Sequence, residues 1–173
     1  MSSALSISQI KLIHETFDEI IEKSRIKESL KHIQHGTTTV FEHSLSVTYY
    51  CLKIANTFKW KIDEKSMIRG ALLHDYFLYD WHDKKTRLKL HGYFHPALAL
   101  KNAMEIFDLN EIEKDIIKHH MFPLTLCPPK TKEGFIIILS DKWCSLYETF
   151  KINEWKNGKY ARKLWTFKED RKY

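Results

Sequence analysis

The chain is poor in glycine and proline, the residues that most often interrupt regular structure. It has 5 glycines and 4 prolines among 173 residues. Turns and loops draw heavily on these two residue types, so their scarcity argues against a sandwich of many short strands and favours long helices. A chain of this length can bury a core without disulfides, and we expect a single domain over residues 1–173.

Cysteines and long apolar runs are also scarce. The three cysteines, Cys51, Cys127 and Cys144, are odd in number and none forms a C-x-x-C pair, which argues against a disulfide framework and a zinc knuckle. The first residues lack the basic segment and apolar run of a secretory signal. No stretch approaches the roughly 20 apolar residues of a membrane span. We therefore expect a cytoplasmic protein without a membrane partner.

Positive charge exceeds negative charge. The chain has 28 lysines and arginines against 22 aspartates and glutamates, a net charge of +6 with histidine neutral. A basic balance favours anionic partners, which include nucleotides, sugar phosphates, nucleic acids and membrane surfaces. The charge alone does not choose among these partners, and no pattern in the chain favours a particular oligomeric state.

Apolar residues recur at helical spacing in several segments, which predicts an all-α fold. We expect Ser8, Asp63 and Asn110 to begin helices and Pro96 to lie in a first turn. The run Ile136–Leu139 has strand propensity, but the wider apolar spacing around it favours a helix. The predicted helices cover residues 6–31, 41–58, 63–77, 96–107, 110–120 and 132–150.

Three segments read as irregular or accessory. Residues 35–39 (H-G-T-T-T) predict a loop, and residues 78–92 predict an irregular excursion over the surface. Aromatic residues in 76–82 either stack on a base or, the favoured reading, belong to the core. The basic, aromatic tail 155–173 is expected to pack on the domain; binding of single-stranded nucleic acid is the alternative.

Polar side chains interrupt the apolar faces of three predicted helices. His43, His74 and Asp141 each continue an apolar stripe, and Asp75 follows His74. Each has an ordinary explanation, as a hydrogen-bonded core histidine or a helix-capping aspartate. A buried carboxylate is nevertheless costly unless it is paired or binds metal. Imidazole and carboxylate together suit divalent ions such as Mn, Fe or Zn, so a shared cation is the economical interpretation.

The motifs around these residues resemble the HD superfamily of phosphohydrolases. They are Phe41-Glu42-His43-Ser44, then Arg69-Gly70-Ala71-Leu72-Leu73-His74-Asp75, then Leu139-Ser140-Asp141-Lys142. The resemblance covers a core of about residues 35–150 and leaves 151–173 as a C-terminal extension. It implies a bundle of about six to seven helices. It also implies metal-dependent hydrolysis of a phosphate ester or anhydride, with His43, His74, Asp75 and Asp141 as ligands of a first metal.

The resemblance also implies a possible second metal. Dinuclear members carry two further histidines between the dyad and the last aspartate, and His95 and His120 match those positions. Helical periodicity prefers His120 to His119. We expect one or two divalent ions, with Fe, Mn, Mg, Zn and Co all open.

Catalysis on this mapping rests on His74, Asp75 and Lys142, with Lys142 placed to bind phosphoryl oxygens. The substrate is expected to be a small phosphorylated molecule such as a nucleotide; a non-catalytic module that binds nucleotide or RNA is the alternative. Other residues considered for phosphate binding or proton donation are Arg69, Asp80, His82, Lys84, Lys85, Arg87 and His91.

Overall fold

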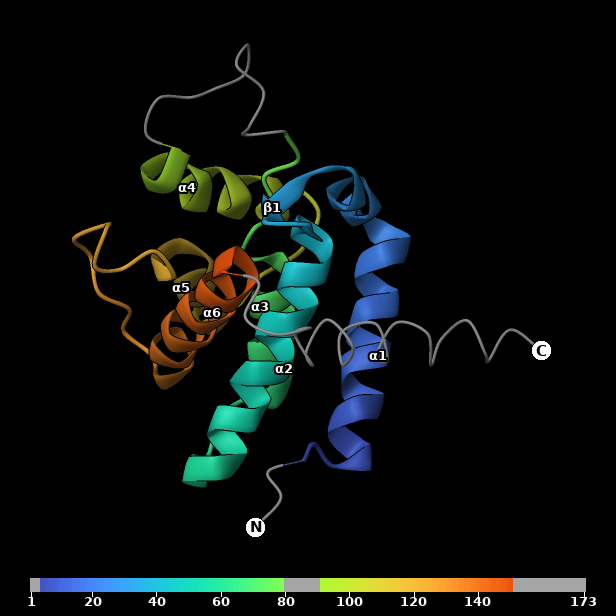
Figure 1. The fold of residues 1–173 in the computed structure, drawn as a ribbon. Coiled ribbons are helices and arrows are strands. Elements are labelled where there is room, and N and C mark those ends of the chain that lie inside the picture. The colour runs from blue at the N-terminus through green and yellow to red at the C-terminus, as the bar shows by residue number, and fades with distance from the viewer. Residues whose placement is uncertain (1–3, 80–90, 151–173) are drawn as a thin grey trace.

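The computed structural model describes residues 4–79 and 91–150 (Figure 1). Helices form most of this part of the chain, which confirms the predicted all-α class. One short two-stranded ribbon joins them. In chain order the elements are α1 (Ile7–Lys23), the 3-10 helix η1 (Ile26–Lys31), β1 (Ile33–His35), β2 (Thr38–Thr39), α2 (Val40–Phe58), α3 (Glu64–Leu73), α4 (His91–Met104), α5 (Glu111–His119) and α6 (Lys132–Phe150).

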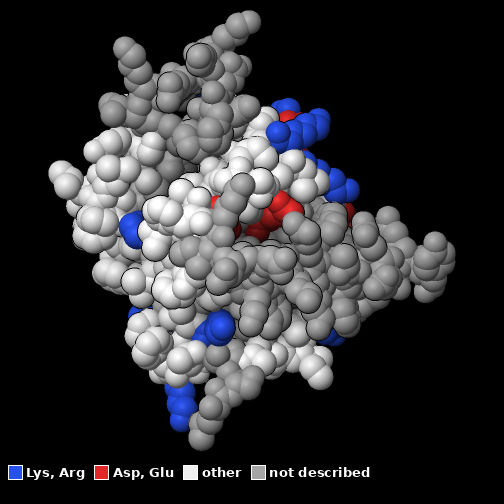
Figure 2. Space-filling model, viewed as in Figure 1, with Lys and Arg blue, Asp and Glu red and all other residues white. Residues whose placement is uncertain are grey.

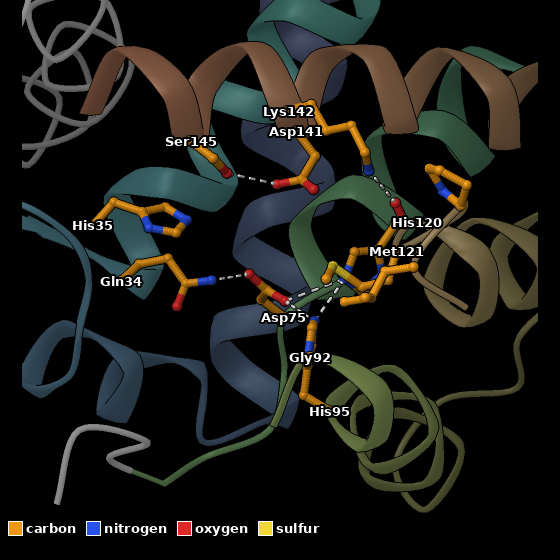
Figure 3. A pocket seen from close by; sticks show the side chains of 12 residues that line it. Gln34, His35, Asp75, Gly92, His95, His120, Met121, Asp141, Lys142 and Ser145 are labelled. Atoms are coloured by element: carbon orange, nitrogen blue, oxygen red, sulfur yellow. Dashed lines mark hydrogen bonds and ion pairs between the residues drawn. The ribbon is translucent and has the colours of Figure 1, made fainter. Parts of the chain in front are cut away.

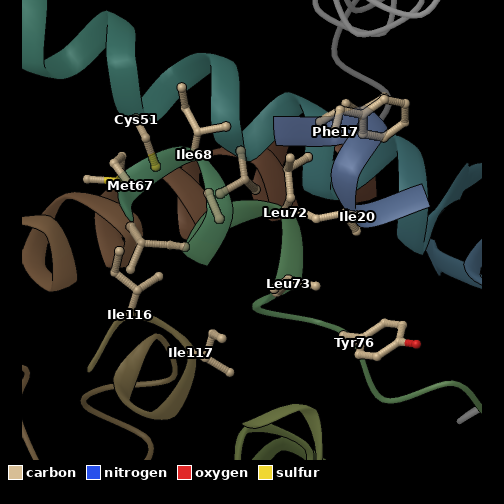
Figure 4. Close-up of a cluster of buried hydrophobic side chains, with 14 of the residues drawn as sticks. Phe17, Ile20, Cys51, Met67, Ile68, Leu72, Leu73, Tyr76, Ile116 and Ile117 are labelled. Atoms are coloured by element: carbon tan, nitrogen blue, oxygen red, sulfur yellow. The ribbon is translucent and has the colours of Figure 1, made fainter. Parts of the chain in front are cut away.

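Helix α2 lies at the centre of the bundle, where it packs against α3 and α6 (Figure 1). Helix α5 packs against α3 and α6, α4 packs against α5, and α1 covers α3. The core between these helices is apolar (Figure 4), and burial of this surface is the main force that stabilises the bundle. Its fully buried members include Ile20, Leu52, Met67, Ile68, Leu72, Ile116, Ile117 and Ile137.

The first helix ends earlier than the sequence predicts, and a different serine caps its start. Ser6, not Ser8, is the N-cap: its side chain accepts from the backbone N–H of Gln9, and the Gln9 side chain accepts in return. The helix ends at Lys23 and a separate 3-10 helix follows, where one helix to residue 31 was expected. The Arg25 backbone N–H donates to the hydroxyl of Tyr76 instead of a helical carbonyl, so a distant residue ends the helix.

Some of the other helix boundaries match the sequence-based prediction and some do not. Helix α6 has its predicted bounds, and Asp63 and Asn110 are N-caps as predicted. Helix α3 stops at Leu73 rather than at residue 77. Helix α4 starts at His91, so Pro96 lies inside it rather than in its first turn. Because proline has a helical φ and removes only one backbone hydrogen bond, α4 continues through Pro96.

The predicted loop at 35–39 is instead a tight antiparallel ribbon that packs against α6. Strands β1 and β2 pair Ile33 with Thr39 and His35 with Thr38. Gly36 turns the chain at a φ of 58°, a conformation that costs other residues energy. A Cβ at Gly36 would lie 2.6 Å from the backbone oxygen of Glu148. The ribbon therefore meets α6 backbone to backbone.

Replacing Gly36 with alanine should destabilise the protein. The left-handed φ and the clash with an immobile backbone oxygen together predict a loss of about 2 kcal/mol or more in free energy of unfolding. Lys59 is a suitable control because it adopts a φ of 54° at the end of α2. Lys59→Gly should leave stability unchanged or slightly higher. Urea denaturation of both variants measures the contrast, and equal effects would contradict the strain at Gly36.

Parts of the predicted accessory segments fall outside the described residues. This applies to residues 80–90 of the predicted excursion and to the whole tail 155–173. Tyr76 and Phe77 are buried, which agrees with the core reading of that aromatic segment, and Trp81 lies outside. Within residues 4–79 and 91–150, no helix is both long and apolar enough to cross a bilayer.

Candidate metal centre

Six polar side chains from five helices meet in the interior. His43 comes from α2, His95 from α4 and Asp141 from α6, while the others stand just past the ends of α3 and α5. All six are buried, with at most 7% of any residue exposed. The structure thus brings together every residue that the sequence predicted as a ligand: His43, His74, Asp75, His95, His120 and Asp141.

One group of these side chains lies between α2, α3 and α6. The Nε2 atom of His43 lies 3.0 Å from Oδ1 of Asp141, and Nε2 of His74 lies 3.9 Å from the same oxygen. Their donor atoms all lie within 4.8 Å of one another. Two imidazoles and a carboxylate at this spacing have the composition of a divalent-metal site.

A second group shares His74 and centres on Asp75. His74, Asp75 and His120 also have donor atoms within 4.8 Å of one another. His95 joins them, because its Nε2 lies 2.8 Å from Nε2 of His120 and 3.2 Å from Oδ1 of Asp75 (Figure 3). The second set of predicted ligands is therefore also assembled.

The carboxylate of Asp75 lies between the two groups. Its Oδ1 faces His95 and His120, at 3.2 and 3.5 Å from their Nε2 atoms. Its Oδ2 faces His74 at 3.4 Å and His43 at 3.9 Å. One carboxylate thus offers one oxygen to each set of histidines, which is the arrangement that a bridging ligand requires.

Backbone hydrogen bonds prepare two of the histidines as ligands. His74 Nδ1 donates to the carbonyl of Ala71 at 2.7 Å, and His120 Nδ1 donates to that of Ile117 at 2.9 Å. In a neutral ring, a proton on Nδ1 leaves the lone pair on Nε2. Nε2 of His74 is buried and has no hydrogen-bond partner among the described residues. Inward-facing lone pairs fit a bound cation.

His43 lies between two carboxylates. Its Nδ1 lies 2.8 Å from Oε2 of Glu148, opposite the contact of Nε2 with Asp141. Burial lowers the pKa of His43, but Glu148 and Asp141 outweigh this effect and raise the pKa well above its usual value. Without metal the ring therefore keeps both protons, and a cation at Nε2 would replace one of them.

Three further pKa shifts keep His120, Asp75 and Asp141 in the forms that bind metal. Burial, helped by neighbouring His95 and His74, lowers the pKa of His120 to about 3, so its ring stays neutral. Burial raises the pKa of Asp75, but facing histidines reverse this and hold it well below its usual range. His43 has the same net effect on Asp141. Both carboxylates are ionised at neutral pH.

Glu148 was not predicted from the sequence, although it carried a detectable signal. It lies two helical turns after Asp141, on the same face of α6, and only 6% of it is exposed. A carboxylate behind a ligating histidine fixes the orientation of the ring and raises its basicity. Glu148 occupies this position for His43.

Glu148→Gln should weaken metal binding while keeping the side-chain shape. Loss of the charge behind His43 should raise the Mn²⁺ dissociation constant by about tenfold or more, as measured by titration calorimetry. Glu133→Gln provides the control, because Glu133 is a buried acid on the same helix that accepts from the backbone of Asp63. Equal Mn²⁺ affinity in both variants would contradict the role of Glu148.

A cavity of about 680 Å³ opens onto the cluster. Figure 2 shows acidic groups in a hollow on one face of the molecule. Lys142 lies on the cavity wall and donates to the backbone carbonyl of His120 at 3.4 Å. Burial lowers the pKa of Lys142, against the opposing effect of Asp141. The lining residues are Gln34, His35, Asp75, Gly92, His95, His120, Met121, Pro123, Leu124, Asp141, Lys142 and Ser145.

Some sequence candidates lie elsewhere. His119 faces away from the ligand cluster and contacts Oδ1 of Asp115 at 2.8 Å. Arg69 forms ion pairs with Glu19 of α1 and Glu113 of α5 and is not among the residues of the cavity wall. The side chain of His91 lies outside the described residues, as do Asp80, His82, Lys84, Lys85 and Arg87.

Two residues of the β1 ribbon join the site without having been predicted. Gln34 donates from Nε2 to Oδ2 of Asp75 at 2.6 Å. His35 lines the cavity and its ring packs edge-on against His43, with centroids 5.5 Å apart. Neither has a sequence signal, because the packing of the Gly36 turn against α6 places them there.

Comparison with known proteins agrees with this geometry. The family model described as "HD domain" matches residues 40–144, which is more than half of the chain and includes all six clustered side chains. No curated protein and no solved structure gave a significant match. The family match, the helical bundle and the assembled histidine and aspartate cluster together show that this chain belongs to the HD-domain family.

Proposed function

We propose that this protein is a metal-dependent phosphohydrolase that holds two divalent cations. The observation that carries the proposal is the position of Asp75, whose two oxygens face two separate sets of histidine Nε2 atoms. Membership of the HD-domain family supports the same class of chemistry. We further propose a small phosphorylated substrate, such as a nucleotide.

The residues fall into two ligand sets. His43, His74 and Asp141 hold the first ion, His95 and His120 hold the second, and Asp75 contributes to both. Mixed imidazole and carboxylate ligands suit Fe, Mn, Co or Zn better than Mg, which prefers oxygen alone. When bound, such ions supply Lewis-acid activation of water and neutralise charge on a phosphoryl group.

The chain itself supplies the remaining functions of the site. Lys142 offers a cation on the cavity wall for phosphoryl oxygens that point away from the ligand cluster. Met121, Pro123 and Leu124 form an apolar section of the same wall, against which the organic part of a substrate can pack. The cavity volume of about 680 Å³ falls within the usual range for small-molecule sites.

Elemental analysis of protein purified without chelator tests the proposal. We expect two equivalents of transition metal per chain. We also expect the protein to release phosphate from at least one of a panel of nucleotides, and this release should stop when the metal is removed. Absence of metal after incubation with Mn²⁺ or Fe²⁺ would refute the metal centre. Metal uptake with nucleotide binding but no turnover on any ester or anhydride would support a non-catalytic binding module instead.

A further inference from the structure

Gln34 has a buried side chain with one satisfied end and one unsatisfied end. Its Nε2 donates to Oδ2 of Asp75 at 2.6 Å, and only 7% of the residue is exposed. Its Oε1 is buried and finds no hydrogen-bond partner among the described residues. A buried carbonyl without a partner costs free energy, so the hydrogen bond to Asp75, which the amide keeps at this cost, calls for a functional explanation.

The orientation of the amide follows from its neighbour. A carboxylate oxygen accepts hydrogen bonds, and the hydrogen bond from Nε2 of Gln34 to Oδ2 of Asp75 fixes the amide nitrogen on that side. The nitrogen of the amide must therefore face Asp75, and Oε1 must point away from it (Figure 3). Gln34 also lines the cavity, so its hydrogen bond to Asp75 lies where the cavity meets the ligand cluster.

We propose that Gln34 is a positioning residue for the metal centre. Its Nε2 holds the Asp75 carboxylate between the two histidine sets. This inference rests on the proposed function, because the role requires the metal centre.

The positioning role is tested by Mn²⁺ titration of Gln34→Met, a variant of similar size that cannot donate. We expect its Mn²⁺ dissociation constant to rise about tenfold or more. Gln9→Met is the matched control: Gln9 is buried and bonds to Asn56 and Glu64 in another part of the bundle. The control should lower the melting temperature and leave Mn²⁺ affinity unchanged. Unchanged affinity in folded Gln34→Met would overturn the positioning role.

In the same titration, failure of wild-type protein to take up Mn²⁺ would instead defeat the proposed metal centre itself.

Discussion

His74→Ala is expected to empty the first metal position and to abolish phosphate release. His74 joins His43 and Asp141 in the first ligand set, and its Nε2 is buried without a hydrogen-bond partner among the described residues. Alanine removes this donor atom. We expect metal content to fall from two equivalents to about one, and a fall in turnover of about 10³-fold or more. Elemental analysis and phosphate release measure the two effects.

His119→Ala is the control for this variant. His119 stands next to His120 in the chain, but its ring contacts Asp115 rather than the ligand cluster. The variant should therefore keep two equivalents of metal and its turnover. Circular dichroism should confirm that both variants retain their helices. Full metal content in His74→Ala, or metal loss in His119→Ala, would contradict the ligand assignment.

Asp75→Asn is expected to cost one metal ion selectively. Gln34 donates to Oδ2 of Asp75, so the amide oxygen of an asparagine must take that side. The new amide nitrogen then faces the Nε2 atoms of His95 and His120, now at the position of Oδ1. An N–H group there donates to a histidine and cannot bind a cation. We expect metal content to fall from two equivalents to at most one, with turnover reduced about 10³-fold.

The control for this change is Asp115→Asn. Asp115 is also buried and accepts from the backbone N–H groups of Lys130 and Thr131. Its replacement should lower the melting temperature and leave two equivalents of metal in place. The spectrum of bound Mn²⁺ in electron paramagnetic resonance distinguishes coupled pairs from single ions. A coupled pair in Asp75→Asn would show that this carboxylate does not bridge.

The sequence was informative where the determinants are local. Scarce glycine and proline, together with apolar periodicity, predicted the all-α class and the bounds of α6. The clustering of His43, His74 and Asp141 was predictable because each is a polar residue on an apolar helical face. The positions of His95 and His120 were predicted from the resemblance to the HD superfamily.

The determinants that escaped prediction act over long separations in the chain. Gln34 reaches Asp75 across 41 positions, and only the fit of Gly36 against α6 brings it there. The early end of α1 depends on the hydroxyl of Tyr76, which follows α3 and is 51 positions from Arg25 in the sequence. No local pattern encodes either contact, because each depends on how the helices pack.

The two histidines that follow α3 and α5 share a property with a wider consequence. Each ring is anchored by a main-chain carbonyl one turn back, at Ala71 and Ile117, whereas His43 is anchored by the side chain of Glu148. A point substitution can delete a side-chain anchor but not a main-chain one. A single substitution at Glu148, far from His43 in the sequence, can therefore change the orientation of the His43 ring. The His74 and His120 positions are protected for as long as their helix ends stay folded.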